Sequence, residues 1–549
     1  MHISDTEKAA FEASSHDDSA FVKFLKRQDI KLLDWGLKRP KLIIGSAITL
    51  IVAAIAIVPF FGSEFLPTFN EGSYVVVVTA PAGTSLEESN KIGTLAEQQI
   101  LKVPEVVSTS RRTGRAELDE HAQPPNFNEI DVALKPSKRS REEVLAEIRK
   151  NLSVIKGAGI GIGQPISHRL EHLLSGVQAQ IAIKVYGEDL NVLRSYADQV
   201  QSIASSVPGA VDVQVENQVL IPQLVIKLNR DALQRYGLQA GKVAEDLEIF
   251  YNGKTESQII DGIKSFDLVL RTNDSTRKNI DAIKNTQIAT QDGTLIPLQQ
   301  IATVQLENNF NVINHENALR RIVISANVQG RDLGSTVKEI QDRVKKELPL
   351  AEGYYIDWEG QFKSQQEAST LITILSIFSF AGIFLVLYGY FKSTRIALQI
   401  MLNIPLALIG SVIAVFLTGG VFSVATMVGF ITLTGIASRN GILMISHYIH
   451  LVEHEGEVFG DKMIVRGSLE RLVPVLMTAL VAALALVPLT MDAAAPGKEI
   501  LYPVAVVILG GLISCTLLDM IVTPVVFKKF GKKALDHYLE TKKKQEVFE

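Results

Sequence analysis

Six long apolar runs constrain this chain more than any other feature of its sequence. The first run is Leu42–Phe61, and the other five follow near the C-terminus: Leu371–Tyr390, Ile396–Thr418, Val421–Ser446, Leu472–Met491 and Ile500–Phe527. A helix of about 20 apolar residues crosses a hydrocarbon core of roughly 30 Å, so each run is long enough to span a membrane. A soluble core has no need for six such runs, and we predict six transmembrane helices.

The distribution of basic residues predicts the orientation of these helices. Lysines and arginines precede the first run, follow the second run and follow the last one, whereas the loops 419–420 and 492–499 contain one lysine between them. Because positive charge is retained on the cytoplasmic side, we expect both termini in the cytoplasm. Residues 1–20 are polar and acidic, so a cleavable signal peptide is not expected, and the first run is predicted to remain as an anchor.

The polar region 62–367 lies between the first two runs and is too long for a loop. Its strand-like and helix-like segments alternate: the strand Gln180–Tyr186 precedes a helix over Leu190–Val207, and the strand Arg321–Val328 precedes a helix over Leu333–Leu348. This rhythm predicts small α+β sandwiches of the split βαβ type. The middle, residues 229–315, has weaker periodicity and is interpreted as an inserted subdomain.

Composition and motifs exclude several other classes of function. The chain carries 55 Lys plus Arg against 59 Asp plus Glu, without a basic block, and therefore gives no indication of nucleic-acid binding. Its one cysteine, Cys515, excludes an intrachain disulfide and a cysteine-based zinc site. Phosphate-binding loops, Gly-x-Ser-x-Gly elbows and His-Glu-x-x-His motifs are absent. We predict that the chain is not an enzyme, binds no cofactor and draws its energy from an ion gradient.

Two ionisable residues, Arg439 and Asp519, lie inside the predicted spans. Such residues are costly in a membrane and are usually functional. Together with the hydroxyl of Thr478 they fall roughly 10 Å from the cytoplasmic face, since a helix rises about 1.5 Å per residue. We predict a polar cluster of these three residues facing the bundle interior. The alternative is that Arg439 and Asp519 reach toward the cytoplasmic interface.

Candidate metal ligands outside the membrane are oxygen and imidazole groups. Residues 62–367 contain no methionine or cysteine, which argues against transport of Cu(I) or Ag(I). The candidate cation path consists of Glu117, Asp119, Glu120 and His121, whose side chains suit Zn(II), Co(II), Ni(II) or Cd(II). No fixed metal site is assigned, because a solvated loop explains the same residues. Surface positions are favoured for His168 and His172, and an interfacial helix explains His447, His450 and His454 as well as a metal site does.

Several segments, in this order and at these spacings, resemble the resistance–nodulation–division (RND) exporters, and in particular their heavy-metal efflux branch. The resemblance begins near residue 22 and covers nearly all that follows. The segments that carry it are Gly62–Pro67, Thr113–His121, Gly163–Ile166, Gly176–Gly187, Arg320–Leu333, Gly435–Asn440, Leu476–Leu489 and Gly510–Phe527. Family members usually contain two similar halves, and this chain resembles the C-terminal half only.

The resemblance implies an α+β membrane protein with six transmembrane helices, ferredoxin-like periplasmic subdomains and an inserted docking subdomain. The implied parts, in chain order, are a cytoplasmic segment (1–41), the first transmembrane helix (42–61), a porter subdomain (62–175), the first part of a second porter subdomain (176–228), the docking subdomain (229–315), the last part of the second porter subdomain (316–367), five transmembrane helices (371–527) and a cytoplasmic tail (528–549).

The resemblance also implies a proton-driven antiporter of the bacterial inner membrane that exports divalent heavy-metal cations as its substrate. Its implied partners are the missing N-terminal half, two further copies in a homotrimer, a periplasmic adaptor and an outer-membrane channel. Arg439 and Thr478 match positions that contact a pair of aspartates in the missing half, whose protonation drives the cycle. Two alternatives are half of a multidrug exporter, and a truncated membrane scaffold that transports nothing.

Overall fold

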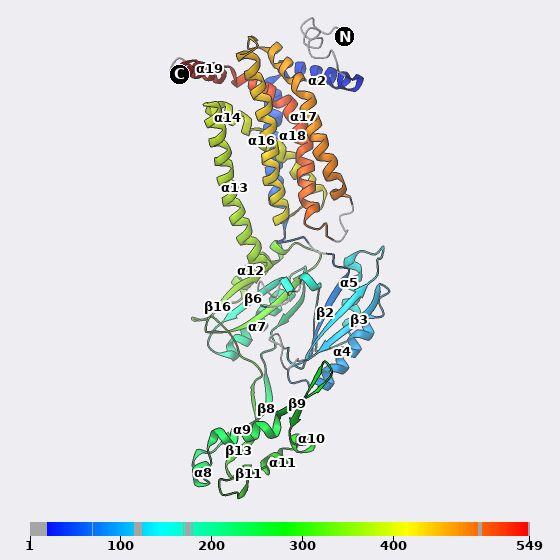
Figure 1. The fold of residues 1–549 in the computed structure, drawn as a ribbon, viewed down its shortest axis with the longest axis vertical. Helices are drawn as coiled ribbons and strands as arrows, with labels where there is room; N and C mark the ends of the chain where they lie inside the picture. The colour runs from blue at the N-terminus through cyan, green and yellow to red at the C-terminus, as the bar shows by residue number, and fades with distance from the viewer. Residues whose placement is uncertain are drawn as a thin grey trace. The chain divides into compact units, whose positions relative to one another are not determined.

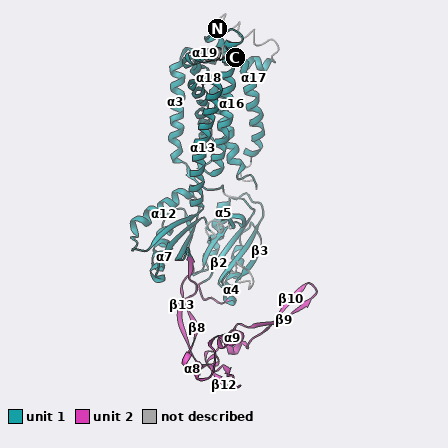
Figure 2. Cartoon of the chain, turned by 60° about the vertical axis from the view of Figure 1, so that its left-hand side comes forward, with its two compact units in different colours: residues 1–80, 86–216, 316–549 teal, residues 81–85, 217–315 magenta. Residues whose placement is uncertain are grey.

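The computed structural model describes residues 19–67, 70–114, 123–167, 169–170, 176, 179–491 and 497–546. The chain divides into two compact units (Figure 2). Unit 1 contains Met1–Ala80, Leu86–Glu216 and Glu316–Glu549, and unit 2 contains Pro81–Ser85 and Asn217–His315. The six spans and two α+β sandwiches belong to unit 1.

Six helices are long and apolar enough to cross a membrane, which confirms the six predicted spans (Figure 1). They are α3 (Pro40–Ile57), α13 (Gln361–Phe391), α14 (Thr394–Met401) continued by α15 (Asn403–Leu417), α16 (Val424–Glu453), α17 (Asp461–Thr490) and α18 (Leu501–Phe530). Helix α13 begins at Gln361, ahead of the apolar run at Leu371, because the intervening residues are polar but contain no helix breaker. Such extensions are invisible to a search for apolar runs.

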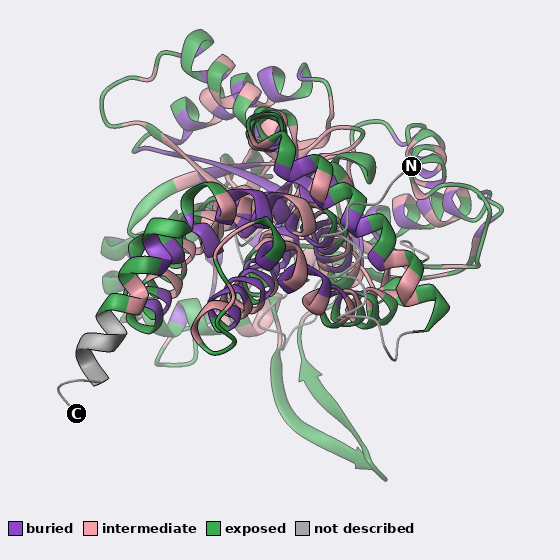
Figure 3. Ribbon diagram, turned by 90° about the horizontal axis from the view of Figure 1, so that it is seen from above, coloured by how far each residue is buried: buried purple, intermediate pink, exposed green. Residues whose placement is uncertain are grey.

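Helices α15, α16 and α18 pack most extensively on one another and form the centre of the bundle. Figure 3 shows how far each residue is buried. In the apolar stretch of α18, 56% of the residues are buried, whereas in that of α13 only 6% are buried. The central helices pack through buried aliphatic residues such as Leu406, Leu433 and Val507. The largely exposed apolar sides of α3, α13 and α17 are what a hydrocarbon environment or further helices would cover.

The first sandwich has four antiparallel strands and two helices. In chain order these are β2 (Ser73–Thr79), α4 (Leu86–Ile100), β3 (Val106–Thr113), β4 (Phe127–Leu134), α5 (Arg141–Leu152) and β5 (Gly159–Gly163), and the sheet order is β3-β4-β2-β5. This is the split βαβ arrangement predicted from the alternating pattern. Its core includes Val76, Ile130, Ile148 and Leu152, which are fully buried.

The second sandwich repeats this arrangement around a fully buried central strand. Its elements are β6 (Ile181–Tyr186), α7 (Leu190–Ser205), β7 (Ala210–Val215), β14 (Asn314–Glu316), β15 (Leu319–Val328), α12 (Leu333–Glu347) and β16 (Tyr355–Gly360). Strand β6 pairs with β15 and β16, and β15 also pairs with β7, all antiparallel. Strands β7 and β15 are therefore neighbours in the sheet although unit 2 separates them in the sequence.

Unit 2 is the inserted subdomain, and it begins earlier than residue 229. Its first strand, β8 (Leu220–Leu228), pairs with β13 (Ala302–Phe310) along its whole length and not with the sheet of β6. Between them lie α8 (Arg230–Arg235), α9 (Ala240–Tyr251), β9 (Lys254–Asp261), β10 (Lys264–Leu270), α10 (Asp274–Arg277), α11 (Ile280–Lys284), β11 (Gln287–Ala289) and β12 (Leu295–Pro297). The pairing of its first and last long strands closes the insertion as a unit.

Two contacts join elements of unit 1 that lie far apart in the sequence. Strand β1 (Gly62–Ser63), directly after the first span, pairs in parallel with β17 (Val421–Phe422), directly before α16. Helix α2 (Ala20–Lys38) packs on α18. The prediction of a cytoplasmic segment over 1–41 does not include this helix. A Cβ atom on Gly36 of α2 would lie 3.4 Å from Ile521, so the two helices approach closely at this point.

Candidate functional site

Asp519 lies on α18 in the middle of the bundle, with only 1% of its surface exposed. The hydroxyl of Thr523, one helical turn later, contacts Oδ1 of Asp519 and also lies 2.8 Å from Oδ1 of Asn403 on α15. Asn403 and Thr523 are buried as well. The apolar helices α15 and α18 therefore enclose a polar cluster at their contact.

Helix α16 supplies the third side of this cluster. Nδ2 of Asn440 lies 3.8 Å from Sγ of Cys515, which is one turn before Asp519 on α18. The next residue, Gly441, has no side chain, and a Cβ atom there would lie 2.2 Å from Nδ2 of Asn403. The glycine thus makes room for the amide of Asn403 between the three helices.

Arg439 and Thr478 do not join this cluster. The side chain of Arg439 is exposed on α16, and no ion pair connects it to Asp519 in the described ranges. Thr478 is exposed on α17, and its hydroxyl donates a 3.0 Å hydrogen bond to the carbonyl of Val475 in its own helix. Distance along a helix predicts depth in the membrane but not direction, and Arg439 is rotated away from its buried neighbour Asn440 by about 100°. The expected single cluster is therefore not formed within this chain.

The candidate cation path, Glu117, Asp119, Glu120 and His121, lies outside the described residues, as do His168 and His172. Within the described part of the chain, no group of three or more histidine, cysteine, aspartate or glutamate side chains is arranged to hold a metal ion. The oxygen and imidazole ligands proposed from the sequence remain predictions.

The histidines at the end of α16 form a stack, and their carboxylate partners lie at the end of α16, in the following loop and on α17. The ring centroids of His447 and His450 are 6.3 Å apart, and those of His450 and His454 are 4.7 Å apart. Nε2 of His447 lies 2.7 Å from a carboxylate oxygen of Glu470 on α17. This contact gives His447 a structural partner and ties the ends of the two helices together.

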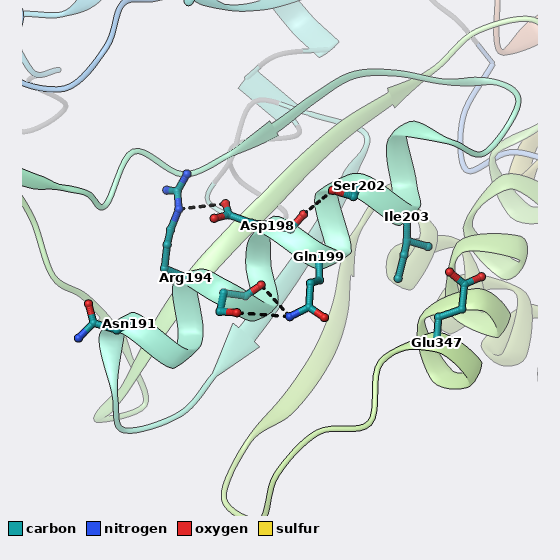
Figure 4. Close-up of a pocket in the computed structure, with 8 residues that line it drawn as sticks. Asn191, Arg194, Asp198, Gln199, Ser202, Ile203 and Glu347 are labelled. Carbon is teal, nitrogen blue, oxygen red and sulfur yellow. Dashed lines mark hydrogen bonds and ion pairs between the residues drawn. The ribbon is translucent and has the colours of Figure 1, made fainter.

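A surface groove on the second sandwich is lined by polar residues of α7 and by Glu347 of α12 (Figure 4). Arg194 in this groove is already paired with Asp198, with 3.0 Å between Nε and Oδ1. Gln199 donates a 3.1 Å hydrogen bond to the carbonyl of Ser195 in the same helix. The polar side chains satisfy one another within α7, so the groove does not present a converging set of ligands.

Asn403, Asn440 and Thr523 are site residues that the sequence-based prediction missed. Each is uncharged, and a search for ionisable residues in apolar runs passes over it. A signal was present in the sequence, because asparagine is rare inside apolar helices, where its amide needs a partner. Only the packing of α15, α16 and α18 shows that these amides surround Asp519.

Six spans, two split βαβ sandwiches inserted after the first span, and charged residues within the spans define a multi-pass membrane protein with a large α+β region. The model of the AcrB/AcrD/AcrF family matches residues 4–531. The chain belongs to this family of RND exporters, as the motifs indicated.

Relatives of known name place the chain in the heavy-metal efflux branch. It is 34% identical to the cobalt-zinc-cadmium resistance protein CzcA of Cupriavidus metallidurans, over 96% of this chain and 50% of that protein. It is also 34% identical to the nickel and cobalt resistance protein CnrA of the same organism, over 90% of this chain and 47% of that protein. A crystal structure of a heavy metal efflux pump superimposes with a TM-score of 0.82 and 30% identity, covering 94% of this chain and 53% of the other.

The chain spans about half the length of the curated relatives it matches. The matched half contains six spans and the polar region between the first two of them. An exporter of the relatives' size therefore contains a second portion of similar length, against which the exposed faces of α16 and α17 can pack.

Proposed function

We propose that this chain forms half of a proton-driven RND exporter of the bacterial inner membrane, and that the exporter's substrates are divalent heavy-metal cations. Two observations support divalent metals. The relatives described above are named for resistance to cobalt, zinc, cadmium and nickel. In addition, residues 62–367 contain no methionine or cysteine, so the soft ligands that Cu(I) prefers are absent from this region.

The exposed position of Arg439 is the observation on which the proposal chiefly depends. A guanidinium stays charged under all physiological conditions, and a charge at the centre of a membrane helix costs at least about 2.5 kcal/mol when it faces lipid. Arg439 lies roughly 10 Å inside the predicted span, so part of this cost applies to it. Arg439 and Thr478 are both exposed on adjacent helices of this half. Acidic residues of the other half, on the same polypeptide or on a separate one, would neutralise Arg439 and accept protons beside it.

Membership of this family also supports a proposal about the larger assembly that the exporter forms. We propose a homotrimer whose unit 2 contacts a periplasmic adaptor and, through it, an outer-membrane channel. In such a complex the two sandwiches of unit 1 would form the path for the cation. Glu117, Asp119, Glu120 and His121 are the proposed weak ligands along that path.

Metal resistance of a sensitive bacterial host tests the transport proposal. The chain and its partner half are expressed together, and growth is measured on graded cobalt, zinc, nickel and cadmium. Arg439→Ala is expected to reduce resistance to that of the empty vector at an unchanged membrane level, and Arg439→Lys to restore part of it. Arg395→Ala, which changes an exposed arginine in the first turn of α14, is the control. Full resistance of Arg439→Ala would contradict the proposed role.

The same assay separates the two alternatives. A multidrug exporter would protect the host from organic toxicants and not from metals, whereas a scaffold would protect it from neither. Replacing the four candidate ligands together by alanine is expected to weaken zinc binding to the full complex, measured by calorimetry. Unchanged binding would leave residues 117–121 as a surface loop.

A further inference from the structure

Asp519 occupies a polar enclosure that is separate from the exposed Arg439. Its neighbours are Asn403 of α15 and Thr523 of α18, and Asn440 of α16 contacts Cys515 one turn earlier on α18. All three residues are at most 3% exposed. No ion pair to Asp519 is formed among the residues that the structure describes. A buried carboxylate without a cation is strongly disfavoured and takes up a proton instead.

The hydrogen atoms available in the cluster are compatible with a protonated Asp519. Thr523 Oγ1 contacts two oxygens, Oδ1 of Asp519 and Oδ1 of Asn403. A hydroxyl has a single hydrogen and can donate to only one of these oxygens. Both contacts become hydrogen bonds when the carboxyl group of Asp519 donates to Thr523, which then donates to Asn403. If the amide of Asn403 is turned, its nitrogen donates to Thr523, which then donates to an ionised Asp519. Burial without a cation favours the first arrangement.

Unpaired atoms remain on the other side of the carboxyl group. Oδ2 of Asp519, Oδ1 of Asn440 and Nδ2 of Asn403 are buried and have no hydrogen-bond partner. Buried polar atoms are almost always paired, so the unpaired oxygen of Asp519 calls for an additional small species, of which a proton is the smallest. A proton satisfies the carboxyl group without adding volume to a packed interior.

The titratable groups that interact with Asp519 from the surrounding helices are a tyrosine and a cysteine rather than cations. Tyr448 of α16 and Cys515 of α18 interact electrostatically with Asp519, and Asp29 of α2 interacts with Tyr448. Asp461 of α17 is paired with Lys528 at the end of α18. Helix α15 contains no ionisable residue, Arg439 of α16 is exposed, and Lys26 of α2 is the buried cation on that helix.

We propose that Asp519 is a proton-binding site enclosed by α15, α16 and α18, with Thr523 and Asn403 as its hydrogen-bond chain. On binding, a proton adds to the carboxylate, and the carboxyl O–H then donates to Thr523. On release, the carboxylate accepts the hydrogen bond of Thr523, and Asn403 loses it. Helix α18 thus exchanges one hydrogen-bonding pattern with α15 for another as the proton leaves. A role of this proton in export rests on the proposed function, whereas the site itself does not.

Infrared spectroscopy of the full-length chain in lipid nanodiscs tests this site. The test uses an Asp29→Asn background, because Asp29 is a second buried carboxyl group that protonates near neutral pH. This chain is expected to show the C=O stretch of a protonated carboxyl group at neutral pH, and the band should disappear reversibly at alkaline pH. Adding Asp519→Asn should remove the band, whereas adding Asp461→Asn, which changes an exposed and paired carboxylate, should retain it. Thr523→Val should shift the band because the hydroxyl partner is lost, and this variant serves if Asp519→Asn does not fold.

Three results would overturn the proposal. One is the absence of a protonated band at neutral pH, and another is a band that Asp519→Asn and Thr523→Val both leave unchanged. The third is a band that disappears when sodium is added at constant pH, since this would identify a cation site. The measurement requires no transport, so a negative result in the metal-resistance assay would leave it unaffected.

Discussion

The backbone amide of Ser63, at the exit of the first span, donates a 3.0 Å hydrogen bond to Oδ1 of Asp332. Asp332 is the N-cap of α12, where the same oxygen accepts a 2.9 Å hydrogen bond from the amide of Ser335. Ser63 also belongs to β1, which pairs with β17 just before α16. The carboxylate of Asp332 therefore connects α12 of the second sandwich to β1, and β1 in turn pairs with β17 just before α16, the helix of Arg439.

The environment of this carboxylate keeps it ionised. Burial alone would raise the pKa of Asp332, but hydrogen bonds from Ser335 and Ser63 hold the pKa below its usual value. Burial, and then the charge of Asp332, raise the pKa of neighbouring Glu64. The connection is consequently strongest above the ordinary aspartate pKa and weakens as the pH falls through the lowered pKa of Asp332.

Asp332→Ala should loosen both attachments of the carboxylate. Loss of an N-cap costs about 1 kcal/mol, and the amides of Ser63 and of the first turn of α12 should exchange hydrogen roughly fivefold faster or more. Hydrogen-exchange mass spectrometry of the full chain measures this change. Asp342→Ala, an exposed aspartate later in α12, should leave the exchange unchanged. Equal exchange in both variants would show that the contact between Ser63 and Asp332 contributes nothing.

Lys184 should be the most sensitive charged residue of the second sandwich. Its Nζ is buried and lies 2.9 Å from Glu316 and 2.6 Å from Glu359. Lys184→Met would leave two partly buried carboxylates facing each other, with Arg321 and Lys363 as their remaining cations. The cost should therefore approach, but not exceed, the roughly 3–5 kcal/mol of a fully broken buried pair. Urea unfolding followed by the fluorescence of Trp358, which pairs with Ile183 across the sheet, measures the loss. Lys91→Met should have almost no effect, because Lys91 pairs only with exposed carboxylates.

The regular part of this fold could be predicted from local sequence, and the contacts between distant segments could not. Uninterrupted apolar runs identify the spans because membrane length sets their size. The strand β8, in contrast, reads as part of the second sandwich until its pairing with β13 is seen. Similarly, the depth of Asp519 follows from counting residues, but its separation from Arg439 depends on how α16 is rotated about its axis.

Asp29 should make the attachment of α2 dependent on pH. Burial raises the pKa of Asp29 from 3.8 to about 7, so the folded state binds more protons than the unfolded state between these values. Stability contributed by α2 should therefore fall as the pH rises from about 4 to 7, by at most about 4 kcal/mol. Hydrogen exchange of α2 at pH 5 and pH 8, corrected for intrinsic rates, measures this loss. Asp29→Asn should abolish the difference and protect α2 at pH 8, whereas Asp34→Asn, which alters an exposed residue, should retain it.

Gly510 allows α15 and α18 to approach closely about two and a half turns before Asp519 on α18. A Cβ atom at Gly510 would lie 2.5 Å from Cβ of Ala414 and 2.7 Å from the carbonyl oxygen of Gly410, so a side chain there must separate the helices. Gly510→Val should destabilise their packing by about 1–3 kcal/mol and expose buried Cys515 to a thiol reagent roughly tenfold faster. Because Cys515 is the chain's one cysteine, the labelling rate reports directly on this contact. Gly435→Val is the matched control, since a Cβ atom there meets nothing within 4 Å, and identical labelling of the two variants would refute the role of Gly510.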